Sequence, residues 1–183
     1  MGRNNYLIWM DLEMTGLNVE TDQIIEIATV ITNTELEVVD NGPVVVIYQG
    51  QEVLDQMSDW SREHHDRSGL TERVKNSTVT LPEAEELTFD FIKNYSEKGQ
   101  APLCGNSIHQ DRLFLAKYMP KVDQFLHYRN IDVSSIKELV YRWYPNLNRF
   151  SKINKHTALE DIYESIDELK YYREKVFVES TAS

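Results

Sequence analysis

The sequence predicts one α/β domain over residues 1–183, in which a mixed β-sheet is flanked by α-helices. Two patterns support this fold class. Apolar, β-branched segments joined by turn-rich stretches fill the first part of the chain, which is typical of strands paired in hairpins. From Gln51 onwards, helical patterns alternate with short apolar segments, which is typical of strands linked by helices. Hairpins followed by strand–helix alternation therefore indicate a mixed sheet covered by helices.

Three strands are expected before Gln51. Residues 6–10 form the first and QIIEIATVIT forms the second. The turn-rich segment GLNVETD between them predicts an antiparallel hairpin. ELEVVD and PVVVIYQ form the third strand, and we expect an interruption at Asn41-Gly42-Pro43 because Gly and Pro weaken strands.

Helices dominate the remainder of the chain. A short helix is expected from Gln51 to Met57, and LPEAEELTFDFIKNY predicts a longer one whose first turn suits Pro82. APLCGN predicts a short buried strand before the helix HQDRLFLAKYM. RNIDV predicts a further strand before the helix SSIKELVYRWY, with Ser134 or Ser135 as its N-cap.

The last helix is expected to begin near Thr157. Thr157 and Glu160 match the T-x-x-E capping box, in which each side chain bonds the other residue's backbone N–H. The apolar residues that follow recur at helical spacing, which predicts one buried stripe. This stripe consists of Ile162, Ile166, Leu169 and Val176.

Composition predicts a soluble globular protein, with 41% hydrophobic and 27% charged residues. Cys104 is the only cysteine, which excludes an internal disulfide framework and fits a reducing, cytoplasmic location. No apolar run approaches the roughly 20 residues that span a bilayer. The N-terminal MGRNNY lacks the apolar core of a signal peptide, so we expect no membrane association.

The net charge of −11 argues against a long nucleic acid as partner, because such binding usually needs a broad basic face. The charge is uneven, however. A basic island between Tyr128 and Lys155 carries a net charge of +4, and it could be a solvated helix face or an anion-binding surface. Its basic residues are Arg129, Lys137, Arg142, Arg149, Lys152 and Lys155, against the acidic Asp132 and Glu138.

Two carboxylates end the first strand, in the segment LIWMDLEMTGL. Asp11 and Glu13 are two positions apart, so they point to the same face with Cα atoms about 6.6 Å apart. They would repel each other unless a cation lay between them, and oxygen ligands of this kind suit Mg²⁺ or Mn²⁺. A strand end that frays into solvent is the alternative, because D-x-E alone is a common pattern.

Two later segments strengthen the metal hypothesis. GNSIHQD places Asp111 at a helix start just after a buried strand. HTALED places His156 ahead of the last helix and Asp161 near its first turn, so both can face one cleft. Singly, Asp111 could be a helix-dipole acid and His156 a surface residue. Together, the four acids and the histidine form a metal-plus-base constellation.

This order of D-x-E, a later Asp and H-x-A-x-x-D resembles the DEDDh exonucleases, which are 3′-to-5′ enzymes with a ribonuclease-H-like fold. Four segments resemble, more narrowly, the oligoribonuclease family, and they cover nearly the whole chain in the right order. They are WMDLEMTGL, GNSIHQDRLFL, HYRNIDVSSIKEL and HTALEDIYESIDELKYYR. His109 departs from the pattern of this family.

The resemblance implies that Asp11, Glu13, Asp111 and Asp161 hold two Mg²⁺ or Mn²⁺ ions. It implies that His156 is the general base for attack by water. The implied substrates are very short RNA oligomers, chiefly dinucleotides, cleaved from the 3′ end to nucleoside 5′-monophosphates. A homodimer is also implied.

The resemblance further assigns residues to the substrate. Leu17 would wedge against the bases, although it could instead be a core residue. Trp60 would line the 3′ side, although it could instead anchor its helix, and His65 would line the same pocket. The 5′ phosphate and the partner subunit's site would be met by Ser107, Tyr128, Arg129 and Ser134, of which Tyr128 would reach the partner.

Two other functions remain open. A proofreading or tRNA-trimming exonuclease would use the same metals on longer substrates, but the acidic charge and the residues expected at the 5′ phosphate disfavour it. A non-catalytic interaction module could keep the fold, but the complete set of four acids and one histidine disfavours it.

Overall fold

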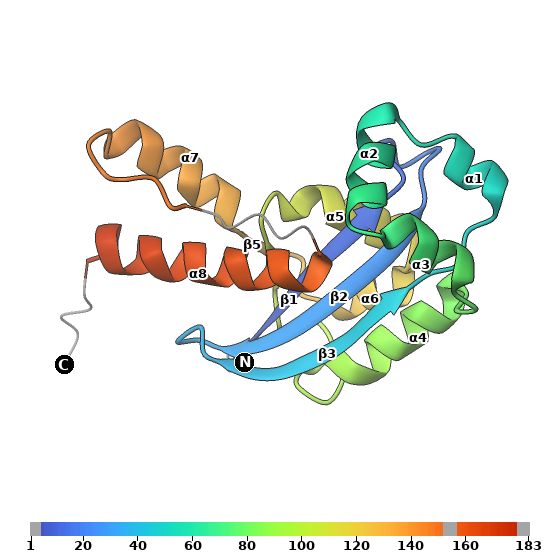
Figure 1. Cartoon of the computed structure of the whole chain (residues 1–183). Coiled ribbons are helices and arrows are strands. Elements are labelled where there is room, and N and C mark those ends of the chain that lie inside the picture. Colours follow the sequence, from blue (N-terminus) through green and yellow to red (C-terminus); the bar gives the residue numbers. More distant parts are fainter. Residues whose placement is uncertain (1–4, 152–156, 179–183) are drawn as a thin grey trace.

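The computed structural model describes residues 5–151 and 157–178, and within them five strands form one mixed sheet in the order β3-β2-β1-β4-β5 (Figure 1). β1 pairs with β2, and β2 with β3, in antiparallel fashion, whereas β4 runs parallel to both β1 and β5. This confirms the predicted fold class and the first hairpin. The strands are β1 (Tyr6–Met14), β2 (Ile24–Asn33), β3 (Val38–Val46), β4 (Leu103–Gly105) and β5 (Asn130–Asp132).

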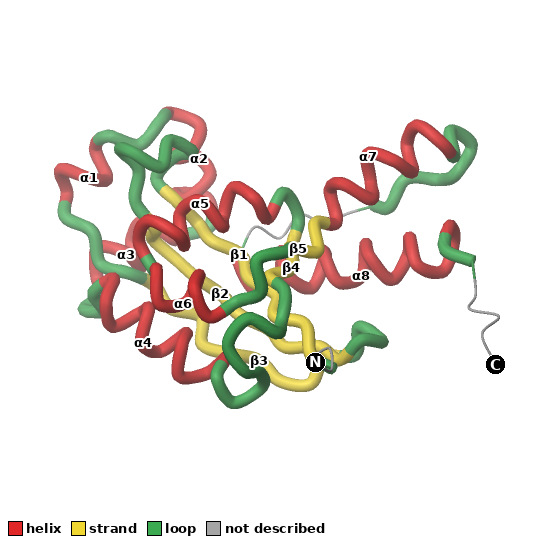
Figure 2. Tube along the Cα trace, turned by 180° about the vertical axis from the view of Figure 1, so that it is seen from behind, coloured by secondary structure: helices red, strands yellow, loops and turns green. Residues whose placement is uncertain are grey.

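Helices cover both faces of the sheet. α4, α5 and α6 pack on one face, which is the face turned to the viewer in Figure 2, and α7 and α8 pack on the other. A third group, α1 to α3, packs against the beginning of β2. The helices are α1 (Gln51–Asp55), α2 (Asp59–Arg67), α3 (Leu70–Asn76), α4 (Leu81–Ile92), α5 (Ile108–Tyr118), α6 (Pro120–Phe125), α7 (Val133–Trp143) and α8 (Ala158–Val176).

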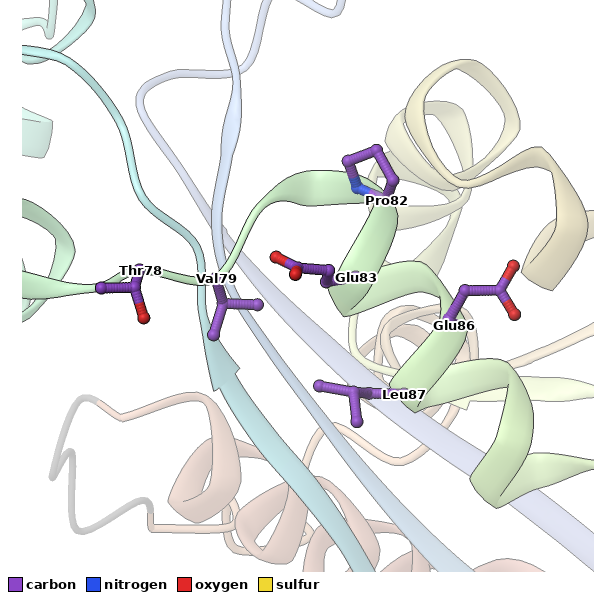
Figure 3. A pocket seen from close by; sticks show the side chains of 6 residues that line it. All are labelled: Thr78, Val79, Pro82, Glu83, Glu86 and Leu87. Atoms are coloured by element: carbon purple, nitrogen blue, oxygen red, sulfur yellow. The ribbon is translucent and has the colours of Figure 1, made fainter.

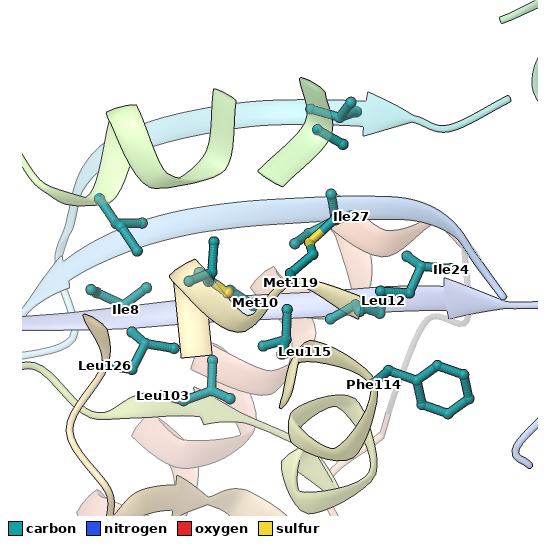
Figure 4. Close-up of a cluster of buried hydrophobic side chains, with 14 of the residues drawn as sticks. Ile8, Met10, Leu12, Ile24, Ile27, Leu103, Phe114, Leu115, Met119 and Leu126 are labelled. Carbon is teal, nitrogen blue, oxygen red and sulfur yellow. The ribbon is translucent and has the colours of Figure 1, made fainter. Parts of the chain in front are cut away.

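The alternation of side chains along β1 decides which face carries the acids. Ile8, Met10 and Leu12 are buried in the cluster beneath α4 to α6 (Figure 4), where each large apolar side chain contributes about 1.5–3 kcal/mol. Trp9 points to the opposite face, where it packs with residues of α7 and α8. Since side chains alternate, Asp11 shares the face of Trp9 and looks toward α8.

Two strand predictions need correction. β1 continues to Met14, so Asp11 and Glu13 lie within the strand and not beyond a frayed end, each with a partner on β2. β3 continues through Asn41-Gly42-Pro43, so the predicted interruption is wrong. An extra residue on β3 shifts the register of its pairing with β2 between Asn41 and Val44, and an edge strand tolerates Pro because one side of it needs no N–H donor.

Helix starts follow the sequence closely with one exception. Thr80 and Glu83 form a full capping box at the start of α4, with Pro82 in the first turn, and Thr157 is the N-cap of α8 as predicted. The N-cap of α7 is Asp132, so the prediction of Ser134 or Ser135 is wrong. The helix begins earlier than expected, which leaves the Asp132 carboxylate to accept the N–H of Ser134 at 2.9 Å.

Within the described residues, no helix combines the length and the apolarity needed to cross a bilayer.

The irregular part of β3 provides a test of packing. A Cβ atom added at Gly42 would lie 2.6 Å from the Phe91 ring and 3.0 Å from the backbone oxygen of Thr29. Gly42→Ala should therefore lower the free energy of unfolding by about 1–3 kcal/mol, measured by urea denaturation. Gly50→Ala is the matched control, since nothing lies within 4 Å of its Cβ position. Equal stability of the two variants would contradict this account of the β3 packing.

Candidate metal site and adjoining cleft

Three carboxylates from the two ends of the chain gather on one face of β1. Asp11 and Glu13 come from the strand, and Asp161 comes from the first turn of α8, where Thr157 caps the helix. One oxygen of each lies within 4.8 Å of the others, a spacing that can hold a metal ion. The sequence grouped these three acids in one hypothetical constellation, and the structure brings them together.

The fourth predicted acid, Asp111, approaches from α5. It is buried, and its Oδ1 accepts the backbone N–H of Leu12 at 2.9 Å, between the two acids of β1. Burial raises the pKa of Asp111 to about 7, although the bond from Leu12 acts in the opposite direction. Asp111 also contributes to the raised pKa of Glu13, so the two carboxylates lie within electrostatic reach.

The charges around Glu13 are mostly negative. Burial, and after it the neighbouring charges of Asp161, Glu26 and Asp111, together raise the pKa of Glu13 to about 8. The positive charge of Arg73 lowers the pKa of Glu13 and so acts in the opposite direction. A cation among these oxygens would relieve the repulsion, so the donor set fits a hard divalent metal such as Mg²⁺ or Mn²⁺.

Sequence reasoning missed Glu26 and Arg73. Glu26 lies directly opposite Glu13 on β2, is almost completely buried, and pairs with the half-exposed guanidinium of Arg73 on α3. The available signal was a single acid inside the apolar run QIIEIATVIT. A buried carboxylate in such a strand needs a cationic partner, and here the partner also places positive charge near the acidic cluster.

An open cleft of about 590 Å³ adjoins the carboxylates, and Glu13 belongs to its lining. Leu17 and Trp60 also line it, with 69% and 72% of their surfaces exposed. Leu17 is therefore not a core residue. The Trp60 ring stacks on His64, with ring centroids 5.2 Å apart, and stays largely exposed, so it does not anchor α2 in the core. Both side chains are available for stacking against a planar ligand.

His65 lies deeper in the same cleft lining. Its Nε2 is 2.9 Å from the backbone oxygen of Met14, and its Nδ1 is 3.9 Å from Oε2 of Glu13. Burial lowers the pKa of His65, so the imidazole is neutral at pH 7 and Nε2 donates to Met14. The ring thus fixes the backbone directly after Glu13.

Ser107 and Ser134 meet where β4 leads into α5. Ser107 has a left-handed backbone, with a φ of 52°, which turns its N–H toward Oδ1 of Asp132 and Oγ of Ser134, at 3.0 and 2.8 Å. The two serine Oγ atoms are 3.0 Å apart. Residues 27 positions apart therefore form one hydroxyl pair.

Tyr128 and Arg129 stand on an exposed segment before β5. The guanidinium of Arg129 lies 5.1 Å from the centroid of the Tyr128 ring, and 72% of the Tyr128 surface is exposed. Arg112 of α5 holds the two ends of this segment, by bonds of 2.8 Å to the backbone oxygen of His127 and 2.6 Å to Oδ1 of Asn130. The exposed pair is thus mounted on a fixed turn.

His156, the predicted base, lies outside the described residues, and its sequence neighbour Thr157 is the cap of the helix that carries Asp161. His109 lies in the first turn of α5, is largely exposed, and has Nδ1 3.6 Å from Oδ2 of Asp132. It therefore neighbours the serine pair and not the acidic cluster.

Of the four basic island residues that the structure describes, three are engaged with other side chains of the protein. Lys137 pairs with Glu168, Arg142 pairs with Glu138, and the Arg149 guanidinium lies over the ring of Tyr141. The island is therefore not one continuous anion-binding surface over the described residues, and the fourth residue, Arg129, lies against the exposed Tyr128 ring.

A separate hollow of about 500 Å³ lies at the start of α4 (Figure 3). It shares no residue with the carboxylate cluster or with the cleft beside it. Glu83, which lines it, is already engaged in the capping box of α4. The hollow thus offers no constellation comparable to the acidic site.

Comparison with known proteins agrees with this geometry. The RNase_T family model, described as an exonuclease, matches residues 8–169. The chain is 53% identical to an oligoribonuclease of Dichelobacter nodosus over 97% of this chain and 98% of that protein. It is 57% identical to an oligoribonuclease of Alcanivorax borkumensis over 94% of this chain and 96% of that protein.

Solved structures agree on the fold. An exonuclease I structure superposes with a TM-score of 0.73 at 13% identity, covering 94% of this chain and 41% of that one. Escherichia coli exonuclease I in complex with a dT13 oligonucleotide superposes with a TM-score of 0.68 at 14% identity, covering 95% and 42%. The chain thus spans about two fifths of these larger proteins. By its family model and its close relatives, it belongs to the oligoribonuclease family of RNase_T exonucleases.

Proposed function

We propose that the protein is a metal-dependent 3′-to-5′ exoribonuclease that hydrolyses very short RNA oligomers, chiefly dinucleotides, to nucleoside 5′-monophosphates. One observation carries the proposal. Glu13 belongs both to the carboxylate cluster and to the lining of a cleft in which Leu17 and Trp60 are exposed. A base stacked there would bring its phosphodiester to the acids. Incubation with a labelled RNA dinucleotide and a longer RNA, with and without chelator, tests the proposal directly.

Asp11, Glu13, Asp111 and Asp161 would hold two divalent cations, Mg²⁺ or Mn²⁺. When bound, the cations would supply a more acidic water and would stabilise charge on the phosphate. The cations would also offset the repulsion between a protein of net charge −11 and an anionic substrate, because positive charge is needed only at the reacting phosphate.

His156 would accept the proton of the attacking water. An imidazole has an ordinary pKa of about 6.5, so it can take up a proton near neutral pH and release it again. Leu17 and Trp60 would hold the 3′ nucleotide, Trp60 by stacking and Leu17 by contact with the base edges. His65 would keep the strand end after Glu13 in place, by its bond to the backbone of Met14.

The limit on substrate length would come from the other end of the substrate. Ser107, Ser134 and Arg129 would bind a 5′ phosphate, with the planar guanidinium meeting two phosphate oxygens at once. The exposed Tyr128 beside Arg129 would reach the site of a second subunit, and the protein would be a homodimer. A proofreading or tRNA-trimming enzyme with longer substrates would not need this arrangement.

Removal of a metal ligand should separate activity from stability. Asp11→Ala and Asp161→Ala should abolish turnover at saturating Mg²⁺, yet the melting temperature without metal should stay equal or rise, because each variant removes a repelling carboxylate. The rise in melting temperature that Mn²⁺ gives the wild type should shrink in both variants. Calorimetry with and without chelator measures this, and wild-type turnover in either variant would exclude the metal assignment.

Loss of the proposed base should affect rate and not affinity. His156→Ala should reduce the single-turnover rate by about 10²–10⁴-fold. Binding of an RNA dinucleotide should be nearly unchanged, and the acidic limb of the pH–rate profile should disappear. A variant that keeps its rate but binds weakly would make His156 a binding residue.

Removal of Arg129 should affect short substrates selectively. A charge-assisted bond contributes about 1.5–3 kcal/mol, so Arg129→Ala should weaken binding of a 5′-phosphorylated dinucleotide roughly ten- to a hundredfold. A longer RNA cannot seat its terminal phosphate there and should lose little. Tyr128→Ala and a forced monomer should act in the same direction as Arg129→Ala. Equal losses for both lengths would instead indicate a general basic groove and a broader exonuclease.

A further inference from the structure

Asn106 connects the serine pair to the last helix. Its Nδ2 donates to Oγ of Ser165 at 2.8 Å and to Oε2 of Glu168 at 3.1 Å. Its Oδ1 accepts from Oγ of Ser134 at 3.1 Å. One amide side chain therefore touches both α8 and the start of α7.

Glu168 fixes the orientation of this amide. The carboxylate is 1% exposed, and its Oε1 accepts from Nζ of Lys137 at 3.0 Å and from the Tyr172 hydroxyl at 2.8 Å. Paired with an ammonium group, Glu168 acts only as an acceptor. Ser165 donates its own proton to the backbone oxygen of Asp161 at 2.8 Å, so it too can only accept from Asn106. Both neighbours thus require Nδ2 on the side of α8.

The orientation of the amide then decides the roles of the two serines. With Oδ1 of Asn106 turned to Ser134, the Ser134 hydroxyl proton is committed to that bond. The lone pairs of Ser134 Oγ are left to accept from the N–H and the hydroxyl of Ser107, at 2.8 and 3.0 Å. Ser107 is therefore the member of the pair with a proton that can be redirected to a ligand.

We propose that Asn106 and Glu168 are positioning residues that orient the hydroxyls of Ser107 and Ser134 for a 5′-terminal phosphate, with Ser107 as the donor. This inference rests on the proposed binding of a 5′ phosphate at the serine pair. A phosphate monoester accepts hydrogen bonds and needs donors pointed at it, so a pair in which both protons were free to rotate would bind it less well. The buried carboxylate thus acts at a distance, by fixing proton positions.

The same contacts tie the pair to the acidic cluster. Asp161, Ser165 and Glu168 lie on one helix, and Ser165 bonds the backbone of Asp161 while it accepts from Asn106. α7, which begins next to Ser134, packs beside α8 (Figure 1). The distance between the serine pair and Asp161 is therefore set by a partly buried hydrogen-bonded network, and a change in Glu168 should alter the preference for a 5′-terminal phosphate.

The test compares binding of a 5′-phosphorylated and a 5′-hydroxyl RNA dinucleotide in buffer with chelator, where no hydrolysis occurs. The measured quantity is the ratio of the two dissociation constants. Glu168→Gln keeps the shape of the side chain but lets its amide donate to Asn106, which permits the Asn106 amide to reverse. The preference for the 5′ phosphate should then fall about tenfold, the value of one charge-assisted bond. Asn106→Ala should lower it similarly, and this variant serves if Glu168→Gln does not fold.

Tyr172→Phe is the matched control. It removes another bond to the same buried carboxylate, on the oxygen that does not face Asn106. It should lower the melting temperature but leave the ratio of dissociation constants at the wild-type value. A purely structural role for Glu168 would give both variants the same result, a lower melting temperature with an unchanged ratio, and would overturn the inference.

Two further outcomes separate this inference from the proposed function. If the wild type prefers the 5′ phosphate and Arg129→Ala loses the preference, an unchanged ratio in Glu168→Gln and Asn106→Ala overturns the positioning role alone. If the wild type shows no preference, both the assignment of the 5′-phosphate site and that of its positioning residues are wrong.

Ser107→Ala should lose more of the preference for the 5′ phosphate than Ser134→Ala, and the reverse order would contradict the assignment of Ser107 as donor.

Discussion

Repulsion among carboxylates on one face of β1 is the constraint to which the surrounding structure responds. Asp11, Glu13 and Asp161 converge there, and burial together with the neighbouring negative charges raises the pKa of Glu13 to about 8. Such a cluster persists only where other interactions hold its parts in place. The apolar side chains on the opposite face of β1 lock the strand into the core, and the Thr157 cap fixes the start of α8. The stored repulsion is what makes the site receptive to cations.

Buried polar contacts serve the exposed parts of the site in a comparable way. Arg112 fixes the turn that presents Arg129, and Glu168 fixes the amide beside Ser134. In each case a charged group that is itself largely withdrawn from water holds the backbone or the hydroxyl of a solvent-facing residue. Exposed groups lose less freedom on binding a ligand if they are already ordered, so under the proposed function these networks would favour affinity as well as stability.

Sequence patterning predicted what depends on local chemistry. The D-x-E spacing placed Asp11 and Glu13 on one face of β1, the T-x-x-E pattern located the start of α8, and the order of the patterns indicated the mixed sheet. That these acids share a site with Asp161 was implied by the family resemblance. Sequence patterning failed where tertiary context decides. β3 passes through Asn41-Gly42-Pro43, which its position at the edge of the sheet permits. Neither α3 nor α6 was predicted from the sequence, because at 7 and 6 residues they are too short to show a periodic signal. The partnership of Glu26 with Arg73 is equally invisible, because only folding brings a β2 acid to an α3 cation.

The position of the acids along the chain has a consequence for biosynthesis. β1 is synthesised well before α8, so Asp11 leaves the ribosome long before Asp161. Closing so long a stretch of chain is entropically costly and comes late in folding. A nascent chain that stops before α8 can form the first hairpin but lacks Asp161. It therefore cannot gather the three carboxylates that could hold a metal ion.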